Sequence, residues 1–151
     1  MMTTTIDQDT FTIAFGRTLH ASRAEVFDAW TNPEQIAEWW DPTGARLATC
    51  EIDLRPGGTF RFVNDGIGPP FSGTYTVIDR PSRLVFEAMG SVGTVALETV
   101  GNCTCMRVTI RCTSKEQLEH FVEMGIASDT DRTLDNLVRY VDASETAPAV
   151  S

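Results

Sequence analysis

The region between residues 45 and 112 constrains the fold most, because apolar and polar side chains alternate through six successive segments. A period of two residues is typical of strands that bury one face. Turn signals such as Arg55-Pro56-Gly57-Gly58 and Asp79-Arg80-Pro81-Ser82 separate the segments, and Gly101-Asn102 predicts a hairpin between the last two. An unbroken series of strands favours antiparallel pairing. The predicted segments are residues 45–54 and 59–64, followed by those around 71–77, 84–86, 95–97 and 106–110.

One further strand and two short helices precede this series. Residues 11–19 alternate in the same way and predict the first strand. Ser22 and Glu25 form a capping box that opens a helix over residues 23–30. Asn32 and Pro33 are typical of the start of a second helix, which ends before the turn at residues 41–44.

The pattern changes to a helical period after Cys112. Ser114 and Gln117 form another capping box. The apolar face at Leu118–Val122 and the one at Leu134–Val141 differ in direction by about 130° at 100° per residue. One straight helix cannot turn both faces toward the same sheet. We therefore expect a break between Gly125 and Asp129, with Ser128 or Asp129 capping a longer helix that ends near Val141.

These elements predict an α+β domain in which the long terminal helix covers the apolar face of an antiparallel sheet of six or seven strands. A chain of 151 residues fits one such domain, which we place at residues 10–142. The polar residues 1–9 and the segment 143–151 are expected to be flexible tails.

Composition disfavours several classes of partner. The formal net charge of −9 opposes binding to nucleic acids and to anionic membranes. Apolar runs are too short for a transmembrane helix, and the N-terminal residues do not resemble a secretory signal. We therefore expect a cytoplasmic protein without membrane insertion.

Ordered sequence patterns resemble the START-like (SRPBCC, helix-grip) superfamily. The patterns are Arg17-Thr-Leu-His-Ala-Ser-Arg-Ala-Glu-Val-Phe-Asp-Ala-Trp-Thr-Asn-Pro-Glu, Trp39-Trp40-Asp-Pro-Thr-Gly, Asp53-Leu-Arg-Pro-Gly-Gly-Thr-Phe-Arg-Phe, Phe71-Ser-Gly-Thr-Tyr and Arg83-Leu-Val-Phe. They are most similar to the branch containing the C-terminal domain of the activator of the heat-shock ATPase chaperone, over residues 11–141. That branch often has Gly-Trp in its last helix, where this chain has Asp129-Thr130.

The resemblance implies a helix-grip fold, in which a curved antiparallel sheet holds a long C-terminal helix with a pocket between them. Members bind lipids, polyketides, hormones or other apolar small molecules, and a minority catalyse reactions. The fold alone does not choose among these functions.

The candidate ligand-binding residues are mainly aromatic residues on the inner face of the predicted sheet. They pack as a filled core or form a pocket wall, and the sequence leaves both open. Tyr75 is the candidate polar group, because a buried phenol hydroxyl needs a hydrogen-bond partner. The set comprises Arg17, Trp39, Phe60, Phe62, Phe71, Tyr75, Phe86, Leu97, Met106 and Phe121.

Arg17 falls on the apolar side of the first strand. A buried guanidinium is costly unless an acid pairs with it. It therefore bonds a structural carboxylate, anchors a ligand carboxylate or reaches solvent at the strand end.

The sequence contains no arrangement typical of a catalytic or metal site. Cys103 and Cys105 share a strand face, but no second cysteine pair with metal-binding spacing accompanies them. His20 and His120 are expected to be solvated. Glu51 and Asp53 fall on the outer face of a strand, where Arg55 or Arg61 can pair with them. We expect neither metal nor cofactor, and an enzyme is less favoured than a binding protein.

Three functions remain open. The first is binding of an apolar or amphipathic small molecule between sheet and helix. The second is a cyclase- or dehydratase-type enzyme that uses the same cavity. The third is a chaperone-cofactor-like interaction domain with a chaperone partner or a second copy of the chain. Chaperone activators carry an additional N-terminal domain, for which nine polar residues leave no room.

The first testable prediction concerns Cys50, Cys103, Cys105 and Cys112. A reduced cytoplasmic protein keeps its thiols free, and two cysteines two residues apart in a strand lie near the upper limit for a disulfide. Thiol titration of the denatured, non-reduced protein is expected to give four free thiols. A result of two would contradict the cytoplasmic interpretation.

Overall fold

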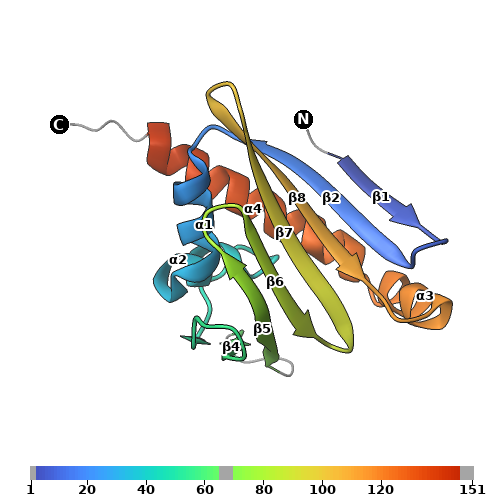
Figure 1. The fold of residues 1–151 in the computed structure, drawn as a ribbon. Helices are drawn as coiled ribbons and strands as arrows, with labels where there is room; N and C mark the ends of the chain where they lie inside the picture. Colours follow the sequence, from blue (N-terminus) through green and yellow to red (C-terminus); the bar gives the residue numbers. More distant parts are fainter. Residues whose placement is uncertain (1–2, 65–69, 147–151) are drawn as a thin grey trace.

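The computed structural model describes residues 3–64 and 70–146, which form eight strands and four helices. Figure 1 shows one sheet, with the helices grouped on one of its faces. The strands are β1 (Thr3–Asp7), β2 (Thr12–Leu19), β3 (Thr49–Ile52), β4 (Thr59–Val63), β5 (Phe71–Asp79), β6 (Arg83–Ala88), β7 (Ser91–Val100) and β8 (Cys103–Arg111). The helices are α1 (Arg23–Thr31), α2 (Pro33–Trp39), α3 (Lys115–Glu123) and α4 (Ile126–Thr146).

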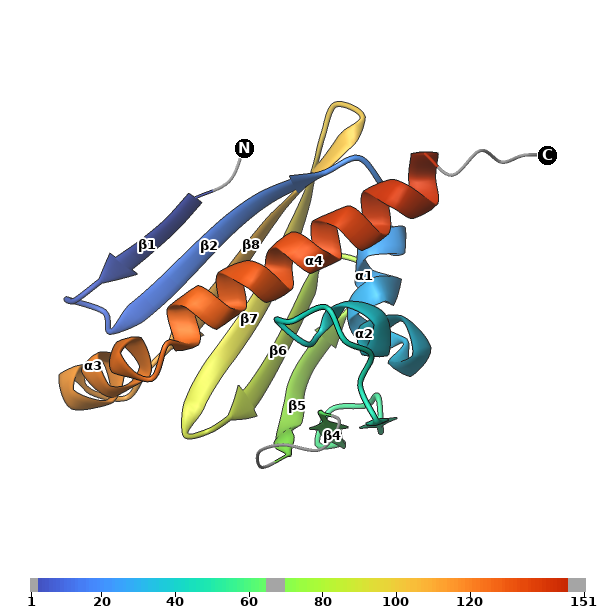
Figure 2. The ribbon, with the colours of Figure 1, turned by 180° about the vertical axis from the view of Figure 1, so that it is seen from behind.

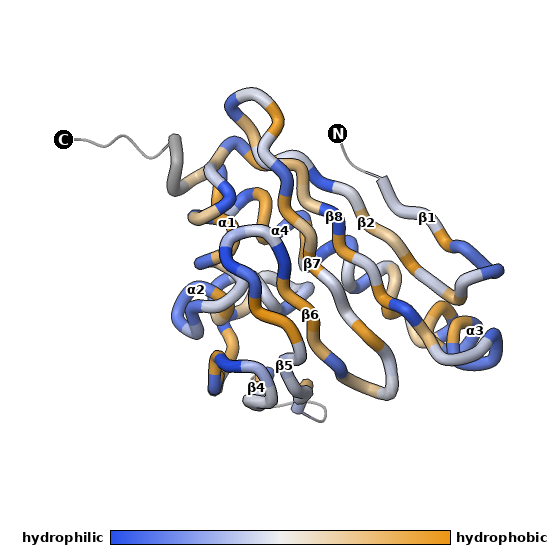
Figure 3. The backbone as a smooth tube through the Cα atoms, in the orientation of Figure 1, coloured by the Kyte–Doolittle hydropathy of each residue, from blue (hydrophilic) through white to orange (hydrophobic). Residues whose placement is uncertain are grey.

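The sheet is antiparallel throughout, with the strand order β1-β2-β8-β7-β6-β5-β4-β3. The β7–β8 hairpin turns at Gly101-Asn102, where Val100 pairs with Cys103, as predicted. Hydrophobic positions recur along β6, β7 and β8, while the β1–β2 turn is hydrophilic (Figure 3). The alternation therefore gives these strands one apolar face and one polar face, and the α+β class is confirmed.

The long helix α4 crosses the apolar face of the sheet from α3 toward α1 (Figure 2). Its side chains Leu134, Leu137 and Val141 are buried. They belong to one hydrophobic core with the inward residues Ile13 and Phe15 of β2. This is the helix-grip arrangement that the family resemblance implies.

The predicted caps of the first three helices are all present. The Ser22 and Ser114 side chains accept hydrogen bonds from the backbone N–H groups three residues later. Asn32 caps α2, with Pro33 at the first position of the helix. These caps satisfy backbone donors that would otherwise have no partner at the helix N-terminus.

The helix break is confirmed, but the predicted cap is wrong. Helix α3 ends at Glu123 and Gly125 has a φ of +81°, a left-handed conformation that favours glycine. The next helix begins immediately afterwards, because the Asp129 N–H already donates to the Gly125 carbonyl. The glycine thus turns the chain between the two faces, and neither Ser128 nor Asp129 starts α4.

Three boundaries differ from the sequence analysis. Residues 3–7, expected within a tail, form the edge strand β1, whose residues are all exposed and therefore show no apolar alternation. The segment 45–54 is a strand only from Thr49 to Ile52, and α4 continues past Val141 to Thr146. The predicted loop at 65–70 lies largely outside the described residues.

Gly125→Ala tests the origin of the helix break. An added Cβ meets no heavy atom within 4 Å, so the cost comes from the left-handed backbone alone. We expect the free energy of unfolding in urea to fall by about 1–2 kcal/mol. Ser128→Ala, at an exposed position, serves as the control and is expected to change it by less than about 0.5 kcal/mol. The reverse pattern would place the cap at Ser128.

Candidate functional site

A cavity of about 220 Å³ lies between the sheet and the N-terminal half of α4. We call it the sheet–helix cavity. Strands β5 to β8 supply side chains on one side, and α4 supplies the opposite wall. Helices α1 and α3 contribute one side chain each, and Trp40 follows the end of α2. Its lining residues are Trp30, Trp40, Pro42, Asn64, Phe71, Phe86, Ala88, Met89, Ser91, Gly93, Val108, Thr109, Ile110, Phe121, Ile126, Asp129, Thr130, Thr133 and Leu134.

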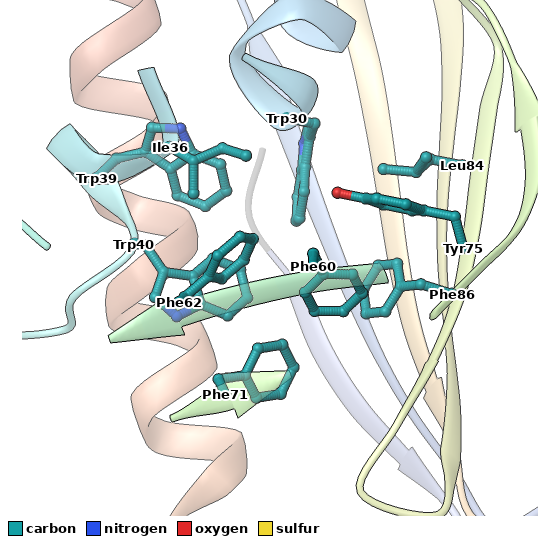
Figure 4. Close-up of a pocket in the computed structure, with 10 residues that line it drawn as sticks. All are labelled: Trp30, Ile36, Trp39, Trp40, Phe60, Phe62, Phe71, Tyr75, Leu84 and Phe86. Carbon is teal, nitrogen blue, oxygen red and sulfur yellow. The ribbon is translucent and has the colours of Figure 1, made fainter. Parts of the chain in front are cut away.

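A second, much smaller space adjoins this cavity. It measures about 10 Å³ and is enclosed mainly by aromatic rings (Figure 4). Neighbouring rings lie 4.9 Å apart for Trp40 and Phe62, and 5.0 Å apart for Phe60 and Tyr75, centroid to centroid. Such separations are typical of packed aromatic pairs. We call this group the aromatic cluster; it consists of Trp30, Trp39, Trp40, Phe60, Phe62, Phe71, Tyr75 and Phe86.

The structure divides the ten candidate residues among three places. Phe71, Phe86 and Phe121 line the sheet–helix cavity. Trp39, Phe60, Phe62 and Tyr75 are buried in the aromatic cluster and do not line that cavity. Arg17, Leu97 and Met106 are buried on the inner face of β2, β7 and β8, outside both spaces. The two interpretations of the aromatic set, filled core and pocket wall, thus apply to different members of it.

Arg17 is 4% exposed and is held by two acids of α4. Its Nη2 lies 2.8 Å from Asp131 Oδ1, and its Nε lies 3.2 Å from Asp135 Oδ1. Nη1 donates to the carbonyl of Thr3 on β1 at 3.3 Å. The sequence left open a structural carboxylate, a ligand carboxylate or solvent as the partner of Arg17. The structure shows structural carboxylates, those of Asp131 and Asp135.

Two cross-strand glycines shape the inner face of the sheet. Phe60 pairs with Gly73, and Phe86 pairs with Gly93. A Cβ added at Gly93 would lie 2.5 Å from two atoms of the Phe86 ring, and one at Gly73 would lie 2.6 Å from Phe60. Each phenylalanine ring therefore packs directly on the glycine beside it, and at Gly73 an added Cβ would also lie 2.3 Å from the Glu87 carbonyl oxygen.

The polar groups around the sheet–helix cavity are few and mostly engaged. Ser91 Oγ donates to the carbonyl of Ala88 at 2.8 Å, and Thr133 Oγ1 donates to the carbonyl of Trp40 at 2.9 Å. Asp129 is the one ionisable residue among the described lining residues, and its side chain is 56% exposed. None of the described lining residues is basic, so an anionic group would meet no cation there.

Tyr75 brings a hydroxyl into the aromatic cluster. Burial raises the pKa of this phenol, and electrostatic interaction with Cys50 adds to the shift. Burial likewise raises the pKa of the Cys50 thiol to about 11. Both groups therefore stay neutral at physiological pH.

The remaining acid–base candidates lie away from the cavity. Glu51 pairs with Arg61 at 3.5 Å and Asp53 with Arg55 at 2.9 Å, as expected. His20 is solvent-exposed and contacts Asp142. Within residues 3–64 and 70–146, no three His, Cys, Asp or Glu side chains converge as a metal site. The four cysteines are free, and no helix of this region is long and apolar enough to span a membrane.

Sequence reasoning missed most of the cavity wall. Trp30 falls in the helix predicted over residues 23–30, and Val108 and Ile110 fall in the strand predicted around residues 106–110, but none of them was assigned to the site. The start of α4, including Ile126 and Thr130, was missed because the helix was expected to begin later. Periodicity showed that these side chains point inward, but not where the interior stays open.

Comparisons with known proteins agree with this architecture. Protein NE0264 from Nitrosomonas europaea is 21% identical with a TM-score of 0.82, covering 93% of this chain and 99% of that one. Ms6760 from Mycobacterium smegmatis is 21% identical with a TM-score of 0.79, covering 97% and 99%. A protein from Arthrobacter aurescens is 23% identical with a TM-score of 0.79, covering 97% and 92%. These identities show a shared fold alone.

No curated protein matches the chain significantly. A family model does match, over residues 20–142, which is most of the described chain. Its span includes the elements from α1 to α4 that form the sheet–helix cavity. The chain therefore belongs to the family described as Activator of Hsp90 ATPase homolog 1-like protein.

Proposed function

We propose that this protein binds a small, uncharged and largely apolar molecule in the sheet–helix cavity. The observation that supports this most is the cavity itself, about 220 Å³ of space between the sheet and α4 with mainly apolar walls. Ligand sites in proteins are concave and apolar with a few polar groups, which describes this cavity. The family resemblance to binders of apolar ligands supports the same function.

The size and charge of the cavity narrow the ligand class. Ligand pockets in proteins typically measure about 300 Å³ or more, and this cavity is smaller. An apolar cavity of roughly 150 Å³ already accommodates benzene, so a molecule with one or two fused rings fits here. Because the described lining residues include an acid but no base, a neutral ligand is favoured over a fatty acid or another anion.

The enzymatic alternative has less support. General acid–base catalysis needs a titratable side chain held at the reacting atom, usually with a pKa shifted by burial. Asp129 sits at the cavity wall with more than half of its side chain in solvent. The hydroxyls of Ser91 and Thr133 are committed to backbone carbonyls.

A chaperone-cofactor role is the second candidate, because the family description names an activator of the Hsp90 ATPase. It would use the surface of the domain, whether the partner is a chaperone or a second copy of the chain. Stimulation of Hsp90 ATPase activity by the purified protein would support this candidate. We propose a cytoplasmic location for either function, in line with the free thiols.

Filling the cavity tests the proposed function. Ala88 lines the cavity, whereas Ala96 is exposed on the other face of the sheet. We expect Ala88→Phe to weaken binding of 2-isopropylnaphthalene by at least tenfold, because the new ring occupies ligand space. Ala96→Phe, the matched control, is expected to leave affinity unchanged. Calorimetry or ligand-observed NMR measures both, and native mass spectrometry of the freshly purified protein searches for a natural ligand. Equal affinity in both variants would contradict binding in this cavity.

Two phenylalanine truncations separate packed core from cavity wall. Phe60 is buried in the aromatic cluster, so Phe60→Ala should lower the free energy of unfolding by about 3–5 kcal/mol. Phe86 is only half-buried and borders the cavity, so its ring makes fewer contacts and Phe86→Ala should cost clearly less. Urea denaturation measures both values. A full-sized loss at Phe86 would show that its surroundings are filled.

A further inference from the structure

The aromatic cluster contains a hydroxyl without a protein partner. Tyr75 is 2% exposed, and its hydroxyl points into the small space that the cluster encloses (Figure 4). The hydroxyl borders this space rather than being sealed off, since every fully buried side-chain N or O atom of the described residues has a hydrogen-bond partner. Within residues 3–64 and 70–146 the structure gives the Tyr75 hydroxyl no hydrogen-bond partner. Buried polar groups almost always have partners, so one that lacks a protein partner points to a ligand or an ordered water.

Two of the three indole N–H groups of the cluster are already engaged. The Trp30 indole N–H donates to Met106 Sδ at 3.3 Å, and the Trp39 indole N–H donates to the Ala29 carbonyl at 3.0 Å. These two indoles therefore have no N–H left to donate to the Tyr75 oxygen.

Four side chains line both the small space and the sheet–helix cavity: Trp30, Trp40, Phe71 and Phe86. Phe86 lies over Gly93, and its ring packs edge-on against Phe60 at 5.6 Å. These shared side chains therefore separate a molecule seated in the larger cavity from Tyr75, and they must move for the molecule to reach its hydroxyl.

We propose that the Tyr75 hydroxyl is the deep polar anchor of the bound molecule, and that the ligand is a neutral ring compound with a carbonyl or ether oxygen at its inner end. This inference rests on the proposed function, since it assigns the ligand of the same cavity. The space beside Tyr75, about 10 Å³, matches one oxygen-sized group and no larger substituent.

The surroundings of Tyr75 explain why the acceptor must be neutral. The residues that enclose the small space are aromatic or aliphatic, and none carries a positive charge. A carboxylate would lose its hydration there without gaining a cation. A phenol is protonated at physiological pH and burial raises its pKa further, so the Tyr75 hydroxyl can donate a hydrogen bond.

Two matched ligands and two matched variants test the anchor. 2-Acetylnaphthalene and 2-isopropylnaphthalene have nearly the same shape, and only the former carries an acceptor oxygen. We expect Tyr75→Phe to weaken binding of the acetyl compound by about fivefold, the value of one neutral hydrogen bond, and to change binding of the isopropyl compound by less than twofold. Tyr140→Phe removes the other tyrosine hydroxyl, outside both spaces, and should affect neither ligand.

The outcomes separate this inference from the proposed function. If neither compound binds the wild-type protein, the proposed function itself is overturned. If both bind but Tyr75→Phe affects them equally, the cavity binds ligands and the anchor is overturned, as expected where water satisfies the hydroxyl. Thermal unfolding of the unliganded Tyr75→Phe variant gives a second readout. We expect no loss of stability, and a lower melting temperature would show that the hydroxyl has a structural partner instead.

Discussion

Arg17 links three parts of the molecule that are distant in sequence. Its guanidinium reaches from β2 to two carboxylates of α4 and to a backbone carbonyl of β1. A buried arginine is tolerated only when its N–H donors form hydrogen bonds or ion pairs. These bonds from Arg17 therefore fix the position and rotation of α4 relative to the sheet. Thr4 adds a hydrogen bond from β1 to the same Asp131. The space beneath the first half of α4 depends on this fixed placement.

The interior on the two sides of Phe86 is filled to different degrees. On one side, the aromatic cluster packs its rings at ordinary contact distances and leaves about 10 Å³. On the other side, Gly93, Ser91 and Ala88 present almost no side-chain volume to the helix, and about 220 Å³ stays open. Small residues on the floor therefore leave space beneath the helix. Gly93 contributes twice, because it also lets the Phe86 ring pack directly on it.

Local rules explain how much of this could be predicted. Capping residues act within one helical turn, so Ser22, Asn32 and Ser114 were identified from sequence. The phase difference between two apolar faces located the break at Gly125. The edge strand β1 was not predicted, because it has no apolar pattern. Backbone hydrogen bonds to β2 and a hydrogen bond from Arg17 hold it in place. The open cavity was not predicted either. An alternating pattern indicates which way a side chain points, whereas the volume of a cavity depends on contacts between residues remote in sequence.

A cavity of this kind has consequences for stability as well as for recognition. The residues that border it give up packing contacts that a filled core would supply, so the unliganded protein is less stable than its secondary structure would permit. A molecule that binds only the folded state supplies the missing contacts. It raises the free energy of unfolding in proportion to the logarithm of the ratio between its concentration and its dissociation constant, once that ratio is large. Because the described cavity wall lacks a basic group, affinity must come from shape and apolar contact, and discrimination from single hydrogen bonds. Replacing a few small residues on the floor of this cavity would therefore change which ligand fits, while the arginine–carboxylate link and the helix caps would keep the frame unchanged.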